Sequence, residues 1–185
     1  MKFIKVVLTL LSLILLTFTN NVNGDQKKKG DMNSYLKRTG EKFLKEIEKK
    51  EGIYKLKSGM LVEFLKEGNN PDARSPTKFD TCDVTYKGTL KDGSQFDAGT
   101  TSFSPNQVIK GWTEAMQLMG EGDQWKLYIP YDLAYGERGS PPRIPGYSPL
   151  VFEIEIHKVK SSGGKSVAEA RKLFEESLAV KEDEL

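Results

Sequence analysis

The sequence predicts an α+β fold in which a twisted antiparallel β-sheet wraps on one short helix. Between residues 53 and 160, apolar and polar side chains mostly alternate, most clearly at 150–157, as on strands with one buried face. A single short helical segment, residues 111–119, stands among these strands and ends at Gly120. The apolar face of such a sheet needs a cover, and this helix can supply it.

Strands and turns can be assigned in order along this region. A strand at residues 60–66 precedes a loop at 68–77 that is rich in Asn, Ser and Pro. Residues 91–94, with the sequence KDGS, are typical of a hairpin turn, so one strand should end at Leu90 and the return strand should begin at Phe96. Two more strands are predicted at residues 125–129 and 150–157.

Amphipathic helices are predicted on both sides of the sheet domain. The segment 25–52 contains a charged leader and then a stripe that recurs every four residues, at Tyr35, Thr39, Phe43 and Ile47. This stripe needs a partner surface, which is either its own domain or a second copy in a homodimer. The segment 161–185 contains a Ser- and Gly-rich hinge and a second helix, opened by the capping box of Ser166 and Glu169.

Residues 1–24 are interpreted as a secretion signal. Lys2 and Lys5 precede an apolar run over 6–18, and small residues lead to a cleavage site after Gly24. The run is shorter than the ~20 residues needed to cross a bilayer, which favours a cleaved signal over the alternative of an uncleaved membrane anchor.

Composition excludes several classes of function. The 185 residues carry a net charge of only +2, which argues against nucleic acid as the partner. With a single cysteine, Cys82, and a single histidine, His157, the chain lacks the residues for an intramolecular disulfide, and it is poorly supplied for a structural zinc site or a Ser-His or Cys-His centre. We therefore expect no metal and no cofactor.

Five blocks between residues 84 and 152 carry a family resemblance. They read VTYKG at 84–88, DGSQFD at 92–97, VIKGW at 108–112, AYG at 134–136 and LVF at 150–152. In this order they resemble the FKBP-type peptidyl-prolyl isomerases, and the sequence GWTEAMQLM at 111–119 is similar to the macrophage infectivity potentiator (Mip) branch. The resemblance implies an FKBP-like isomerase domain at 53–160, and a dimerisation helix like that of bacterial Mip proteins.

The resemblance also implies a site that binds substrate in an aromatic pocket. Trp112 would form its floor, Ile144 would close its far side, and the walls and rim would come from Phe96, Phe103, Val108, Ile109 and Phe152. Tyr86, Asp97 and Tyr135 would be the catalytic residues, with Tyr135 donating to a substrate carbonyl and Tyr86 orienting Asp97. Taken singly, each of these residues could instead be an ordinary core or turn residue.

The implied reaction does not need the cysteine and histidine residues in which the chain is poor. Rotation about an Xaa-Pro bond faces a barrier of ~18–20 kcal/mol because the amide C–N bond has partial double-bond character, and no bond to a nucleophile has to form. The implied partners are proline-containing peptides, unfolded client proteins, and macrolides of the FK and rapamycin type. The alternative is a non-catalytic folding chaperone or interaction module that uses the same pocket. The proline-rich loop at 139–145 departs from the usual Gly-rich loop and bears on substrate preference.

The chain ends in Glu182-Asp183-Glu184-Leu185, which resembles the retrieval tetrapeptide of the endoplasmic reticulum except at its first position. The sequence therefore predicts a protein of the secretory pathway, either held in the endoplasmic reticulum lumen or secreted.

Overall fold

The computed structural model describes residues 30–70, 72–160 and 164–179. Its main strands are β1 (Ile53–Lys55), β2 (Leu61–Lys66), β4 (Thr81–Leu90), β5 (Gln95–Phe103), β6 (Gln124–Ile129) and β7 (Leu150–Lys160). The other elements are the short strands β3 (Arg74–Ser75) and β8 (Lys165–Ser166), the helices α2 (Lys110–Met116) and α3 (Val167–Ser177), and the 3-10 turns η1 (Pro105–Gln107) and η2 (Tyr131–Leu133). A further helix spans residues 30–48.

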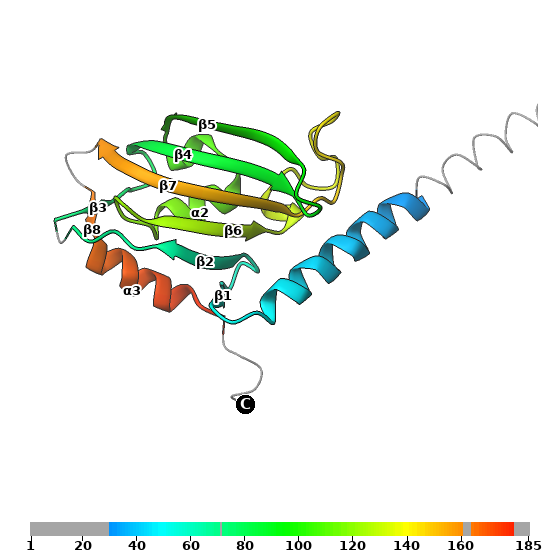
Figure 1. The fold of residues 1–185 in the computed structure, drawn as a ribbon, viewed down its shortest axis with the longest axis horizontal. Helices are drawn as coiled ribbons and strands as arrows, with labels where there is room; N and C mark the ends of the chain where they lie inside the picture. Colours follow the sequence, from blue (N-terminus) through cyan, green and yellow to red (C-terminus); the bar gives the residue numbers. More distant parts are fainter. Residues whose placement is uncertain (1–29, 71, 161–163, 180–185) are drawn as a thin grey trace, which may run out of the picture.

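The six main strands form one antiparallel sheet in the order β1-β2-β6-β7-β4-β5. It curves around α2, as Figure 1 shows. The predicted α+β class is confirmed. The hairpin between β4 and β5 turns through Gly93, whose φ of +86° explains why the KDGS turn needs a glycine there.

The face of the sheet that meets α2, called here the inner face, carries the main core. On β7, Phe152, Ile154 and Ile156 point into it, and on β6 Trp125 and Leu127 do the same. These are the alternate positions of the sequence pattern, because successive side chains on a strand point to opposite faces.

The N-terminal helix, residues 30–48, packs on the opposite, outer face of the sheet. Ile47 forms a buried cluster there with Leu61, Tyr128 and Val151, and Phe43 packs against it. The sequence allowed this helix to pack either on its own domain or on a second copy, and its C-terminal half packs on its own domain. Nearer the N-terminus, Met32 and Tyr35 stay 56% and 53% exposed.

Helix α3 is attached to the same core as the sheet. Its capping box of Ser166 and Glu169 is formed, and Phe174 is buried against the inner-face cluster. Arg171 donates a 2.9 Å hydrogen bond to Asp123, which is 1% exposed and also accepts from backbone N–H groups. α3 is therefore held by apolar packing and by an ion pair to a buried aspartate.

Several predicted segments lie outside the described residues. They are the signal peptide at 1–24, the leader up to residue 29, residues 161–163 of the hinge, and the terminal tetrapeptide. Within the described ranges, no helix has both the length and the apolar character needed to cross a membrane.

Candidate active site

Trp112 stands at the centre of the candidate site because α2 packs closely on β6. A Cβ atom at Gly111 would come within 2.6 Å of the Ile129 side chain, so only glycine allows this approach. The next residue, Trp112, is 3% exposed. Its indole N–H has no hydrogen-bond partner among the described residues, so packing alone holds the ring.

Three aromatic rings surround the Trp112 indole. Ring centroids lie 5.2 Å away for Tyr86, 5.9 Å for Phe103 and 5.0 Å for Phe152, at interplanar angles of 77°, 81° and 84°. The rings are thus nearly perpendicular to the indole, the edge-to-face geometry that aromatic pairs favour. The β4–β5 hairpin supplies two of these rings, and β7, which is distant in sequence, supplies the third.

Phe96 extends this group, and Gly88 makes room for it. The Phe96 ring lies 5.4 Å from that of Phe152 at 86°. A Cβ atom at Gly88 would lie 2.6 Å from Phe152 and 2.7 Å from Phe96, so a larger residue would push the two rings apart. We call Tyr86, Phe96, Phe103, Trp112 and Phe152 the Trp112 cluster. Gly88 belongs to a quoted sequence motif, yet its role was not predicted, because it depends on contacts between three strands.

Tyr86 and Asp97 form the polar part of the site. The Tyr86 hydroxyl donates a 2.9 Å hydrogen bond to Oδ2 of Asp97, while Oδ1 accepts from the N–H of Ala98 at 3.0 Å. Burial, and then the bond to Asp97, raises the pKa of Tyr86, and Tyr135 adds to this rise. The hydroxyl therefore stays protonated at neutral pH and fixes the orientation of the carboxylate.

The segment between β6 and β7 supplies the other predicted residues. Ile144 is buried in the same core as Trp112, whereas Tyr135 is 43% exposed. Ser140 and Ile144 exchange two backbone hydrogen bonds, and Arg143 donates to the carbonyl of Phe96 at 3.1 Å. The segment is thereby tied to β5 next to Asp97.

Val108 and Ile109 lie between η1 and α2, half-buried against the core that contains Trp112. The carbonyl of Ile109 accepts the first hydrogen bond of α2, from Thr113 at 3.0 Å. The predicted apolar residues thus come together around Trp112, and Asp97 and Tyr135 are the two predicted site residues with exposed side chains.

The remaining polar candidates lie away from this site. Cys82 is buried, and burial raises the pKa of its thiol to about 12, so it is not a reactive thiolate at neutral pH. His157 is exposed and bonds to Thr85 at 2.7 Å. Within the described ranges, no group of three or more His, Cys, Asp and Glu side chains could hold a metal ion.

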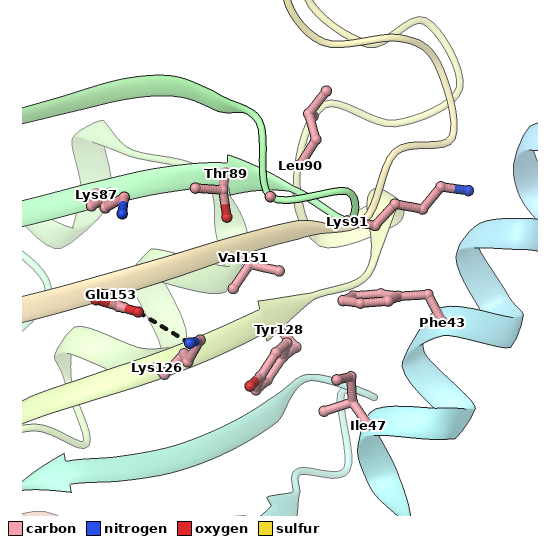
Figure 2. Close-up of a pocket in the computed structure, with 11 residues that line it drawn as sticks. Phe43, Ile47, Lys87, Thr89, Leu90, Lys91, Lys126, Tyr128, Val151 and Glu153 are labelled. Atoms are coloured by element: carbon pink, nitrogen blue, oxygen red, sulfur yellow. Dashed lines mark ion pairs between the residues drawn. The ribbon is translucent and has the colours of Figure 1, made fainter.

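A separate groove of about 310 Å³ lies on the outer face, between the sheet and the N-terminal helix. Figure 2 shows Phe43 and Ile47 on its helix side and Tyr128 and Val151 on its sheet side. Because Val151 and Phe152 are neighbours on β7 and point to opposite faces, the sheet separates this groove from the Trp112 cluster.

Comparison with known proteins identifies the family. The FKBP_C family, described as FKBP-type peptidyl-prolyl cis-trans isomerase, matches residues 72–157. The "Macrophage infectivity potentiator" of Trypanosoma cruzi is 40% identical over 98% of this chain and 96% of that protein. The chain is an FKBP-type peptidyl-prolyl cis-trans isomerase of the Mip branch.

Two further relatives support the assignment of this chain to the FKBP-type isomerases. The "FKBP-type 22 kDa peptidyl-prolyl cis-trans isomerase" of Escherichia coli is 41% identical over 65% of the chain and 59% of its own length. The crystal structure of FkpA from Escherichia coli matches with a TM-score of 0.70 at 32% identity, over 83% of this chain and 73% of that one. The family and the FKBP-like fold predicted from the sequence are confirmed.

Proposed function

We propose that this isomerase holds the proline of an Xaa-Pro segment over the Trp112 indole and accelerates rotation by binding the twisted amide. The observation that carries this proposal is the set of rings standing at 77° to 84° to the indole. A flat floor with upright walls suits the compact, apolar pyrrolidine ring. The buried side chains of Ile144 and Phe152 would close the space around it.

Such a pocket favours the transition state over the ground state. A planar amide is polar because of resonance, and rotation removes that resonance, so the twisted amide loses less on entering an apolar site. Only this difference in binding raises the rate, at about 1.4 kcal/mol for each factor of ten. No proton transfer and no covalent intermediate are needed.

The polar groups would orient the peptide around the rotating bond. In this proposal Tyr135, on the exposed segment, donates from its hydroxyl to a substrate carbonyl, as does the backbone N–H of Ile109. Asp97, held by Tyr86, places a fixed negative charge beside the amide. Macrolides of the FK and rapamycin type would compete for the same pocket.

We further propose that the clients are unfolded proteins of the secretory pathway. The support is the signal-like segment at 1–24 and the terminal Glu182–Leu185, which favours the endoplasmic reticulum lumen slightly over secretion. To test this, the last four residues are removed and the amounts of protein in the medium and in the cells are measured. Retention of the wild type together with secretion of the variant would indicate retrieval, and equal secretion of both would contradict it.

A homodimer through the N-terminal helix also stays a proposal. Its support is that Met32 and Tyr35 remain exposed on that helix. Sedimentation equilibrium of the mature chain, residues 25–185, would show a dimer that Tyr35→Ser weakens; a monomer at all concentrations would exclude it.

The decisive test compares the two tryptophans. Both Trp112 and Trp125 are buried, and neither indole N–H has a partner among the described residues. Trp112→Phe should weaken rapamycin binding by about tenfold or more and raise KM for prolyl peptides, while Trp125→Phe should affect thermal stability only.

Equal effects of the two substitutions on binding would place the pocket elsewhere. Rapamycin binding by a wild-type protein without isomerase activity would instead indicate the non-catalytic chaperone or interaction module.

A further inference from the structure

The middle turn of the N-terminal helix, residues 37–40, lies against a segment that carries predicted site residues. At Gly40, a Cβ atom would lie 2.9 Å from Cδ of Pro149 and 3.2 Å from the carbonyl oxygen of Tyr147. Glycine at this position lets the helix backbone itself approach the segment between β6 and β7, which contains Tyr135 and Ile144.

Lys37, one helical turn earlier, reaches the other end of this segment. Electrostatic attraction to Tyr131, and then a side-chain hydrogen bond to it, raise the pKa of Lys37. The rings of Tyr131 and Tyr147 pack 5.2 Å apart at 60°. Lys37 and Gly40 therefore contact a tyrosine pair that joins the start of the segment to its end.

Thr39 links the same turn to the other strand of the site. The ammonium of Lys91, in the β4–β5 hairpin turn, donates to the Thr39 hydroxyl at 2.5 Å. Phe96 and Asp97 follow this turn on β5. One helical turn thus contacts both chain segments that bear the proposed catalytic groups.

Backbone hydrogen bonds carry these contacts towards the site. Gly136 donates to Tyr131 at 2.7 Å and accepts from Tyr147 at 3.1 Å, and Gly139 donates to the carbonyl of Tyr135 at 3.2 Å. We therefore expect a displacement of the tyrosine pair to move Tyr135 as well. Because Arg143 bonds the Phe96 carbonyl, the two segments are also tied to each other.

These contacts are additional to those that anchor the helix. Phe43 and Ile47 already fix its C-terminal half on the outer face of the sheet, and Figure 2 shows both side chains directed towards that face. Packing of the C-terminal half of the helix therefore does not depend on Lys37, Thr39 or Gly40.

We propose that Lys37, Thr39 and Gly40 are positioning residues, which set the placement of Tyr135, Ile144 and Asp97 and through them the preference for the residue before proline. This inference rests on the proposed binding of Xaa-Pro at the Trp112 cluster. It assigns to the N-terminal helix a role in catalysis on short peptides, in addition to any role in dimerisation or client binding.

The first test compares alanine at two glycines of the same helix. A Cβ atom at Gly30 would have no described atom within 4 Å, in contrast to one at Gly40, so Gly30→Ala adds a methyl group without a clash. Activity is measured on short peptides that differ only in the residue before proline. Gly40→Ala should lower kcat/KM by about two- to thirtyfold, to a different extent for each peptide and mainly through KM, whereas Gly30→Ala should match the wild type.

The second test removes polar contacts without changing the backbone. Lys37→Met and Thr39→Val should each change the order of peptide preference and weaken rapamycin binding. Lys37→Arg, which keeps the positive charge, should retain most of the wild-type preference and binding. Lys45→Met, at an exposed position of the same helix, is the control.

If the wild type is active in the assay, either of two results would overturn the proposal. One is an unchanged preference profile in Gly40→Ala and Lys37→Met. The other is a uniform loss for all peptides that follows the unfolded fraction measured by circular dichroism. A wild type without activity in the same assay would instead count against the proposed function.

Discussion

The hydroxyl of Tyr86 on β4 donates a 2.9 Å hydrogen bond to the carboxylate of Asp97 on β5. The two residues are not direct partners in the ladder, since Tyr86 pairs with Gly99 and Asp97 pairs with Gly88. On β4, Asp97 therefore meets two residues with separate roles: a tyrosine that orients the carboxylate, and a glycine that leaves room for the aromatic rings.

Removing the Tyr86 hydroxyl tests the orientation of Asp97. Tyr86→Phe keeps the ring against Trp112 but loses a hydrogen bond to a carboxylate, worth about 1.5–3 kcal/mol. If the bond orients Asp97 for catalysis, kcat/KM should fall by about tenfold or more. Tyr128→Phe is the matched control, because Tyr128 bonds Glu63 at 2.8 Å on the outer face. Equal activity of the two variants would show that catalysis does not depend on the orientation of Asp97 by Tyr86.

Gly88→Ala should disrupt the Trp112 cluster. Its new methyl group would meet Phe152 at 2.6 Å and Phe96 at 2.7 Å, so the rings must separate. We expect a loss of macrolide affinity of about tenfold or more, measured by calorimetry. At Gly99 the nearest atoms would lie at 3.7 Å, an ordinary contact, and Gly99→Ala should bind as the wild type does. Unchanged binding by Gly88→Ala would show that ligands do not use these rings.

The pH dependence of kcat/KM should be nearly flat across neutral pH, because twisting an amide transfers no proton. The pKa of Tyr86 is raised above its usual value near 10, so its contribution to stability is complete below the unfolded pKa and is lost as the pH rises through the higher folded pKa. The contribution of Tyr86 to activity and to stability should therefore decline only in alkali. A bell-shaped profile centred near pH 7 would indicate acid–base catalysis.

Arg171 should contribute strongly to stability. Its guanidinium pairs with buried Asp123 at 2.9 Å and lies 5.7 Å from the centre of the Phe64 ring. Arg171→Leu leaves the buried Asp123 side chain without its ion-pair partner, which should lower the free energy of unfolding by about 3 kcal/mol. Urea unfolding measures this, with exposed Lys172→Leu as a control expected within about 0.5 kcal/mol of wild type. A comparably small effect of Arg171→Leu would show that the ion pair adds little to the attachment of α3.

Local patterns determined much of the fold. The alternation at 150–157 places Phe152, Ile154 and Ile156 on the buried face because a strand turns successive side chains to opposite sides. The KDGS turn required glycine at 93, and the capping box of Ser166 formed as predicted. Family motifs in order then identified an FKBP-type isomerase, which the comparisons confirmed. Each of these features depends on residues that are close in sequence or recur in a known order.

Only the tertiary structure decided where the helices sit and which small residues they need. The N-terminal stripe could serve a second copy or its own domain, and the contact of Ile47 with Tyr128 selected the domain for that half of the helix. Gly40 against Pro149, Gly88 between Phe96 and Phe152, and Arg171 on Asp123 join positions far apart along the chain. No local pattern encodes such contacts, because the effect of a glycine or of a single charged residue depends on which residues the folded chain places next to it.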